Sequence, residues 1–340
     1  MPFPAPLRRA VTATLLPAAL MLAGCSGPAP APGSALPLRQ VQDLPLPGGA
    51  TRLDYQSIDP AARRLYIAHM GDGTVDAVDL DKPAVDGTAQ GTASVHGVMV
   101  APDRHTLLAS AAGTNEIALI DTRTLRETGR VKSGDLPDGI AYDPNHGKAY
   151  VSNEHDHALT VIDLTTGKDR SPIEVGGGTG NVIYDPASGK VFVNGQDRGE
   201  LLIIDPATDA VTDRLKVDGC NGPHGLFIDG AKQLAFIACE GNAKLLVLDL
   251  RSKEITARFD TGNTPDVLAF DQGLHRLYLA AEDGTVSVFD ERDRALVPVA
   301  SAKLYDHAHT VAVDQATHRV YFPLQDINGH AVLRIMEPAK

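Results

Sequence analysis

The segment PDGIAYDPNHGKAYVSNEHDHALTVID, residues 137–163, contains three short apolar runs separated by turn residues such as Gly, Asp and Asn. Asp143 closes the first of these runs and Asp163 closes the third. Short alternating runs between turn residues are typical of β-strands joined by tight turns. The segment therefore predicts three consecutive strands of an antiparallel sheet.

Both aspartates recur along the chain with one period. The first column consists of Asp59, Ala101, Asp143, Asp185, Asp229, Asp271 and Asp314. The second column consists of Asp79, Asp121, Asp163, Asp205, Asp249 and Asp290. Successive members lie 41 to 44 residues apart. A repeat of this length, built from short strands, is typical of propeller blades, each of which is a four-stranded sheet. We therefore predict an all-β fold, a seven-bladed β-propeller of four-stranded blades over residues 38–340.

The last repeat lacks one strand. It supplies apolar runs at residues 310–313, 320–323 and 331–335 only. Residues 38–46 have the length and alternation of the missing outer strand, so we predict that this N-terminal strand closes the last blade and thereby the ring. In the first blade, residues 83–94 are rich in Gly, Thr and Ala, and Gly and Ala are depleted in strands. We expect a loose outer edge there.

The N-terminal region has the features of an export signal. Arg8 and Arg9 precede a small apolar run, and residues 1–24 predict a signal peptide too short to span a membrane. The run ends in Leu-Ala-Gly-Cys at residues 22–25, which resembles the bacterial lipobox, and this resemblance implies lipidation of Cys25. An ordinary secretory signal is the alternative. Residues 25–37 would then be the lipidated cysteine and a Pro/Ala/Gly-rich tether. Ser26 fits outer-membrane sorting, so we expect a protein anchored there and facing the periplasm.

Two cysteines remain for the folded domain. Cys220 precedes the innermost strand of the fifth blade and Cys239 ends its second strand, so an antiparallel hairpin brings them together. An oxidising envelope favours a disulfide between them. Two buried thiols or a metal-thiolate pair are the alternatives.

The charge of the chain disfavours polyanionic partners. The formal net charge is −12, and it becomes −14 once Arg8 and Arg9 leave with the signal. Nucleic-acid binding needs a concentrated basic surface, and the sequence has no Lys/Arg run beyond pairs. Trp is absent and aromatic residues are few, so stacking platforms are poorly supplied. We expect a monomer that binds no nucleic acid and meets the membrane only through its lipid.

The second strands of the repeats carry a family resemblance. Residues 150–153 read Tyr-Val-Ser-Asn, one change from the tetrapeptide YVTN. The same aromatic position recurs as Tyr66, Phe192, Phe236, Tyr278 and Tyr321. The segments 54–55, 95–97, 137–139 and 220–229, together with Cys239, resemble the YncE-like branch of the YVTN-repeat β-propeller family. The resemblance covers residues 38–336 and implies a seven-bladed ring in the bacterial envelope, but no particular activity.

One more column predicts the mouth of the central channel. It lies five residues before each member of the first aspartate column: Asp54, His96, Asp138, Gly180, His224, Asp266 and His309. Each histidine has an aspartate in an adjacent blade, an arrangement that orients an imidazole toward a metal ion. We therefore predict a metal or small-ligand site, with one divalent ion such as Zn, Mn, Fe, Ni or Cu as the cofactor. Polar lining of a hydrated channel is the alternative reading.

A second layer of polar residues is expected on the same face. Eleven residues after each member of the first aspartate column stand Met70, Ala112, Glu154, Gln196, Glu240, Glu282 and Gln325. Five of these seven residues, all but Met70 and Ala112, are polar. They predict an acidic rim suited to a cation, an amine or an envelope protein. His155 and His157 on one of these loops are expected to face solvent. His105, His146, His275 and His318 fall in tight turns on the opposite face and need only solvent.

These features favour a binding or scaffolding module anchored in the envelope. The alternative is a metal-dependent hydrolase or lyase of the lactonase type, in which His96, His224 and His309 hold the ion. Asp138 or Asp266 would then act as the base. Loss of turnover in His224→Ala with the fold retained would favour the enzyme.

Overall fold

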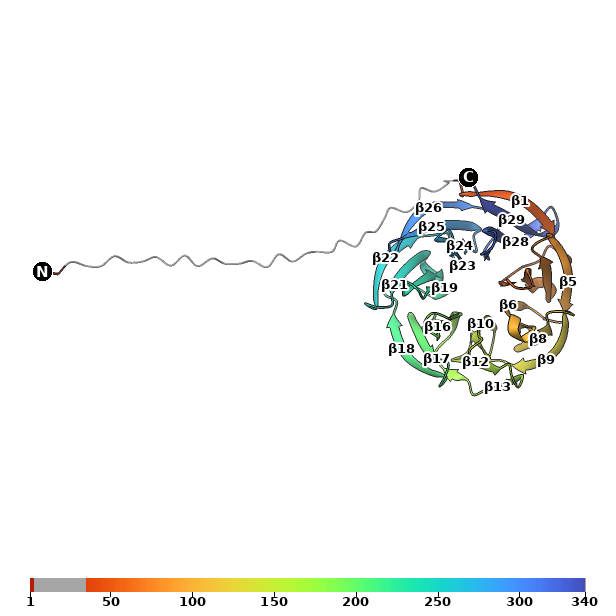
Figure 1. The fold of residues 1–340 in the computed structure, drawn as a ribbon, viewed down its shortest axis with the longest axis horizontal. Coiled ribbons are helices and arrows are strands. Elements are labelled where there is room, and N and C mark those ends of the chain that lie inside the picture. Colours follow the sequence, from red (N-terminus) through yellow and green to blue (C-terminus); the bar gives the residue numbers. More distant parts are fainter. Residues whose placement is uncertain (3–34, 340) are drawn as a thin grey trace.

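The computed structural model describes residues 1–2 and 35–339. Within residues 35–339, seven antiparallel sheets surround a central channel, which confirms the predicted all-β, seven-bladed β-propeller (Figure 1). No helix in the described part of the chain has the length and apolar character needed to cross a membrane. The expected signal peptide, Cys25 and most of the tether lie outside the described residues.

Blades one to six run outward from the channel in chain order. Blades one and two consist of β2 (Gln56–Asp59), β3 (Arg64–His69), β4 (Thr74–Asp79), β5 (Ala84–Gln90), β6 (Val95–Ala101), β7 (Thr106–Ala111), β8 (Glu116–Asp121) and β9 (Arg126–Lys132). Blades three and four consist of β10 (Pro137–Asp143), β11 (Lys148–Asn153), β12 (Ala158–Asp163), β13 (Lys168–Asp169), β14 (Ile173–Glu174), β15 (Thr179–Asp185), β16 (Lys190–Gly195), β17 (Glu200–Asp205) and β18 (Ala210–Lys216).

Blades five and six repeat this pattern, and blade seven uses both ends of the domain. They consist of β19 (Pro223–Asp229), β20 (Leu234–Cys239), β21 (Lys244–Asp249), β22 (Glu254–Asp260), β23 (Pro265–Asp271), β24 (Arg276–Ala281), β25 (Thr285–Arg292), β26 (Ala295–Lys303), β27 (Ala312–Asp314), β28 (Arg319–Ile327), β29 (His330–Pro338) and β1 (Leu38–Pro45). Three 3-10 turns join strands: η1 (Met70–Asp72), η2 (Pro102–Arg104) and η3 (Glu240–Asn242).

The N-terminal strand closes the ring as predicted. β1 pairs antiparallel with β29 from Leu38 opposite Pro338 to Pro45 opposite Val332. In Figure 1 the orange β1 lies against the blue β29. Leu38 and Leu44 are buried and join two different inter-blade apolar clusters. Closure therefore provides both backbone hydrogen bonds and apolar burial.

The repeating aspartates hold the turns that follow their strands. Asp59 Oδ1 accepts hydrogen bonds from the backbone N–H groups of Ala61 and Ala62, at 3.0 and 2.9 Å. In the second column, Asp163 Oδ1 accepts from the backbone N–H groups of Thr165 and Thr166 in the same way. A short carboxylate that accepts backbone N–H groups two and three residues ahead stabilises a tight turn. The period of these aspartates is therefore the period of the turns.

The expected loose edge in blade one is wrong. β5 pairs with β4 along its whole length, from Thr74 opposite Gln90 to Asp79 opposite Ala84. A side chain at Gly87 would overlap Leu125 of blade two, so the small residue lets the neighbouring blade pack close. The interrupted outer edge is in blade three, where β13 and β14 have only two residues each. Pro172 lies between them and has no N–H to donate to a ladder.

The predicted disulfide is confirmed. Cys220 and Cys239 are bonded, with their Cα atoms 5.1 Å apart. The bond joins the segment before β19 to the end of β20. It therefore ties together the two chain segments of blade five that lead to His224 and Glu240 at the channel mouth.

Candidate functional site at the channel mouth

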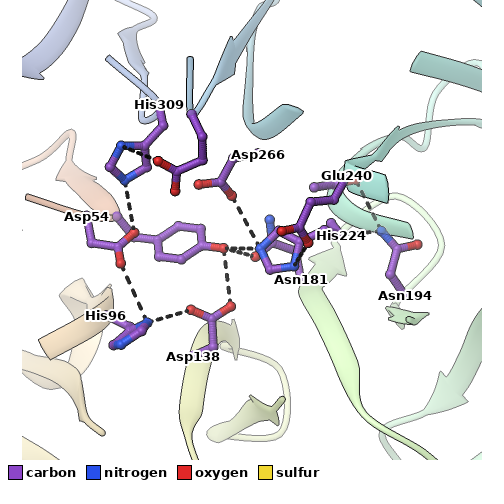
Figure 2. Close-up of polar contacts among 12 residues, drawn as sticks. Asp54, His96, Asp138, Asn181, Asn194, His224, Glu240, Asp266 and His309 are labelled. Atoms are coloured by element: carbon purple, nitrogen blue, oxygen red, sulfur yellow. Dashed lines mark hydrogen bonds and ion pairs between the residues drawn. The ribbon is translucent and has the colours of Figure 1, made fainter. Parts of the chain in front are cut away.

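The polar column predicted to surround the channel does so, because the innermost strands approach one another closely at their first residues. His96, Asp138, His224 and Asp266 are second residues of β6, β10, β19 and β23. A Cβ atom on Gly97 would lie 2.1 Å from the carbonyl oxygen of Asp138 in the next blade. Only glycine permits this approach. Figure 2 shows the side chains of this column converging from several blades on the channel axis.

Each histidine of the column lies beside an aspartate of a neighbouring blade. His96 Nδ1 lies 3.6 Å from Asp54 Oδ2 and 3.5 Å from Asp138 Oδ1. His224 Nε2 lies 3.3 Å from Asp266 Oδ1. This is the pairing that the repeat predicts, and Figure 2 draws these contacts as dashed lines.

The same carboxylates determine the charge of the buried imidazoles. Burial alone would lower the pKa of His224, but the adjacent Asp266 outweighs burial and raises it to about 10. Burial also opposes the charge on His309, and Asp54 raises the pKa of His309 to about 9. At neutral pH both rings are therefore protonated on both nitrogens and positively charged.

Several carboxylates at the mouth are themselves perturbed. Burial is the main reason that the pKa of Glu154 rises to about 7, and the negative charge of Asp138 adds to the effect. Burial likewise raises the pKa of Asp54, against the opposing influence of His309. A carboxylate with a raised pKa lacks the contacts that would stabilise its charge. A bound cation would supply such contacts.

Tyr55 crosses the channel, which the repeat analysis did not predict. Its hydroxyl lies 2.6 Å from Asn181 Oδ1, 3.2 Å from Asp138 Oδ2 and 3.2 Å from His224 Nε2. Tyr55 comes from blade one, whereas these partners belong to blades three, four and five. The only sequence signal was the Asp54-Tyr55 pair of the family resemblance, because the column rule selects position 54 and not 55.

Tyr55 separates two cavities along the channel. The one at the mouth has a volume of about 260 Å³ and is lined mainly by polar and charged side chains. The one below Tyr55 measures about 240 Å³ and is lined mostly by aliphatic side chains such as Val98, Leu226 and Val311. We call the cavity at the mouth the acidic pocket. It is polar, and Tyr55 forms its inner boundary.

The predicted rim contributes four of its five residues to the acidic pocket. Glu154, Gln196, Glu240 and Glu282 line it, whereas Gln325 is not among the lining residues. Gln196 donates to Glu240 across the boundary between two blades, at 2.9 Å. The sequence analysis missed Arg52, whose Nη2 donates to Glu282 Oε1 at 2.6 Å. Arg52 lies outside both repeating columns, so the period could not select it.

Potential metal ligands form two separate groups at the channel mouth. Within the described residues, one group is Asp54, Asp266 and His309, and the other is Asp138, Glu154 and His224. In each group the ligand atoms lie within 4.8 Å of one another. The structure thus divides the predicted ring: each group contains one histidine, and His96 lies between Asp54 and Asp138.

The remaining histidines are structural or solvent-facing. His155 and His157 are exposed, as expected. His105 and His275 occupy left-handed turn positions, each with φ of 51°. The expectation that the other two turn histidines need only solvent is wrong. His146 Nδ1 lies 2.7 Å from Asp143 Oδ2, and His318 Nδ1 lies 2.9 Å from Asp271 Oδ2 in the neighbouring blade.

Comparison with known proteins defines the fold class and goes no further. The chain matches no protein-family model and no curated protein. Among solved structures, it is similar to a chain of Kuenenia stuttgartiensis hydrazine synthase, with a TM-score of 0.72. The match covers 82% of this chain and 94% of that chain at 18% sequence identity. At this identity the similarity concerns the β-propeller architecture and carries no activity with it.

Proposed function

We propose that this protein is a binding module of the bacterial cell envelope whose acidic pocket takes a small cationic ligand. The observation that carries the proposal is the charge of the pocket lining. It contains six carboxylates, which are Asp54, Asp138, Glu154, Glu240, Asp266 and Glu282. Its permanent positive charge is Arg52, which Glu282 already neutralises. The protonated His224 is paired with Asp266, so carboxylates remain in excess. A concave site with an excess of one sign of charge concentrates ions of the opposite sign.

The dimensions of the pocket limit the size of this ligand. A cavity of about 260 Å³ is smaller than most sites for drug-sized molecules. Tyr55 closes its inner end through contacts with Asp138, Asn181 and His224. A metal ion with its water, or a small amine, fits this compartment, whereas a folded segment of a partner protein does not.

The geometry favours binding over the hydrolase alternative. Asp138 and Asp266, the two bases considered for hydrolysis, lie 3.5 and 3.3 Å from imidazole nitrogens of His96 and His224. Because the raised pKa of His224 keeps that ring protonated, Asp266 is held in an ion pair. A carboxylate stabilised by an adjacent cation has a lowered proton affinity and is a poor base.

Calorimetric titration of the full chain with 1,4-diaminobutane and, separately, with MnCl₂ and ZnCl₂ tests the proposal. We expect one cation per chain and an affinity that falls with ionic strength. Glu240→Gln should weaken binding about tenfold, since a contact to a charged group is removed. Glu254→Gln on the outer strand β22 of the same blade makes the same charge change and should leave affinity within about twofold. Absence of binding by every cation, or equal effects of the two variants, would contradict the proposal.

We propose in addition that a lipid on Cys25 holds the protein at the outer membrane, with residues 26–37 as a spacer before β1. The support is the Leu-Ala-Gly-Cys sequence at 22–25 followed by Ser26. Metabolic labelling with an alkyne fatty acid should mark the wild type and not Cys25→Ser, and the variant should leave the membrane fraction. An unlabelled wild type, or a variant that stays on the membrane, would overturn the anchor without touching the pocket proposal.

A further inference from the structure

We infer that Asp54, Asp266 and His309 bind a divalent transition-metal ion at the wall of the acidic pocket, which Asp54 and Asp266 line. The inference rests on the proposed cation-binding function and names the ligand class and its three protein ligands. These residues come from blades one, six and seven, which are neighbours around the ring. Their exposed fractions are 2%, 6% and 2%, so all three are buried. Figure 2 shows His309 joined to Asp54 by a dashed line, with Asp266 nearby.

Unpartnered atoms are the first observation that points to a ligand. Among the described residues, Asp54 Oδ1, Asp266 Oδ1 and His309 Nε2 are buried and make no hydrogen bond. His309 Nε2 and Asp54 Oδ1 are 3.8 Å apart, and the nearest cationic neighbour of Asp266 Oδ1 is His224 Nε2 at 3.3 Å. Each buried polar atom without a partner costs about 1–3 kcal/mol. A cation between the three residues would satisfy Asp54 Oδ1 and His309 Nε2, and it would give Asp266 Oδ1 a partner in addition to His224.

The orientation of His309 is the second observation. Its Nδ1 lies 2.9 Å from the backbone carbonyl oxygen of His307. A carbonyl oxygen only accepts, so Nδ1 carries a proton and donates it there. In the neutral ring the lone pair is then on Nε2, which faces Asp54. A metal-bound imidazole almost always donates its other N–H to a carbonyl or carboxylate in this way.

The donor set selects the kind of ion. One imidazole nitrogen and two carboxylate oxygens suit Zn²⁺, Mn²⁺, Fe²⁺, Co²⁺ or Ni²⁺, whereas Mg²⁺ and Ca²⁺ prefer oxygen ligands alone. Three protein ligands leave further coordination positions for water or a small molecule from the pocket. A proton on His309 Nε2 is the competing occupant.

The other group of potential ligands provides an internal control. The Tyr55 hydroxyl lies 3.2 Å from both Asp138 Oδ2 and His224 Nε2, so two of its three members are already engaged. Asp138 and Asp54 are equally buried, with exposed fractions of 1% and 2%. Asp138→Asn and Asp54→Asn therefore make the same substitution at equally buried positions, one in each group.

The experiment uses the full chain, purified without a polyhistidine tag and stripped with EDTA. CoCl₂ is titrated while visible absorption reports nitrogen and oxygen coordination, and ZnCl₂ then competes against a chromogenic chelator. We expect one ion per chain. His309→Gln and Asp54→Asn should each weaken binding at least about 100-fold, because each removes a ligand. Asp138→Asn removes a pocket carboxylate but none of the three ligands, so it should weaken binding about tenfold, and Glu254→Gln outside the pocket should stay within about twofold. Circular dichroism melting checks that all variants are folded.

The outcomes separate this inference from the proposed function. Unchanged affinity in both His309→Gln and Asp54→Asn, or equal losses in Asp138→Asn, would overturn the ligand assignment. Binding of 1,4-diaminobutane without binding of Co²⁺ or Zn²⁺ would overturn the metal site and leave the cation-binding pocket standing. Binding of none of these cations would overturn both.

Discussion

The innermost strands β10 and β23 carry aspartates at both ends, and the two ends behave differently. At the closing end of β10, Asp143 accepts from the backbone N–H of Asn145 at 2.9 Å and lies 2.7 Å from His146 Nδ1, all within its own turn. At the mouth end of the same strand, Asp138 meets Tyr55 of blade one and His96 of blade two. The carboxylate with local partners stabilises a turn, whereas the one with partners from other blades belongs to a site.

The largest effect should come from removing the strand that closes the ring. Deletion of residues 38–47 would expose one edge of β29 and remove the buried side chains of Leu38, Leu44 and Leu46. Burial of each contributes about 1.5–3 kcal/mol, so the melting temperature should fall by about 10–20 °C. Thermal melting followed by circular dichroism measures this. An unchanged melting curve would mean that pairing of β1 with β29 does not stabilise the propeller.

Loss of the disulfide should have the next largest effect. Cys220→Ser/Cys239→Ser should lower the free energy of unfolding by about 2–4 kcal/mol, because the cross-link restricts the unfolded chain. Urea unfolding of the wild type and the double variant measures the difference. A reducing agent should lower the wild type to the level of the variant and leave the variant unchanged. Equal stability of the oxidised wild type and the variant would contradict this role.

A matched pair of substitutions tests the comparison directly. Asp143 and Asp138 stand in one strand with exposed fractions of 0% and 1%. Asp143→Asn should cost about 1–3 kcal/mol, because an amide replaces a carboxylate that accepts backbone N–H groups and contacts His146. Asp138→Asn should cost less than about 1 kcal/mol, since the amide oxygen still accepts from Tyr55. Urea unfolding that reversed this order would refute the division between the two ends.

The smallest effect should be a pH dependence of opposite sign at the two ends. Burial would raise the pKa of Asp314 in a closing turn, but Arg63 and Thr317 lower it to about 2. Its contribution to stability is present above the ordinary pKa of 3.8 and is lost as pH falls toward 2. Burial and Asp138 raise the pKa of Glu154 at the mouth to about 7. The folded state is then favoured at low pH, and stability is lost as pH rises from 4.5 to about 7.

Melting curves between pH 2 and 8 separate these contributions in metal-free protein. Asp314→Asn should reduce the fall in melting temperature between pH 4 and pH 2. Glu154→Gln should have a higher melting temperature than the wild type at pH 8 and the same one at pH 4. A Glu154→Gln variant that is less stable than the wild type at pH 8 would show that the folded protein stabilises the charged form of Glu154, which contradicts its raised pKa.

Much of the fold was predictable because its determinants are local and repeated. The Asp-turn contacts of Asp59 and Asp163 involve residues two and three positions ahead, so the period of the sequence carries them directly. The edge of blade one was not predictable in this way. Gly and Ala disfavour a strand locally, yet Gly87 accommodates Leu125 of the next blade, and this contact depends on packing between repeats.

The sequence by itself determined the number of blades, the strand that closes them and the polar column at the mouth, because each follows from spacing along the chain. It favoured the disulfide, and the structure decided between the bond and its alternatives. Only the tertiary structure decided how that column is divided. Tyr55 reaches across the channel to Asn181 and engages Asp138 and His224, whereas Asp54 Oδ1 and His309 Nε2 make no hydrogen bond. A period specifies which residues face the axis, but which of them meet depends on distances between blades that are far apart in the chain.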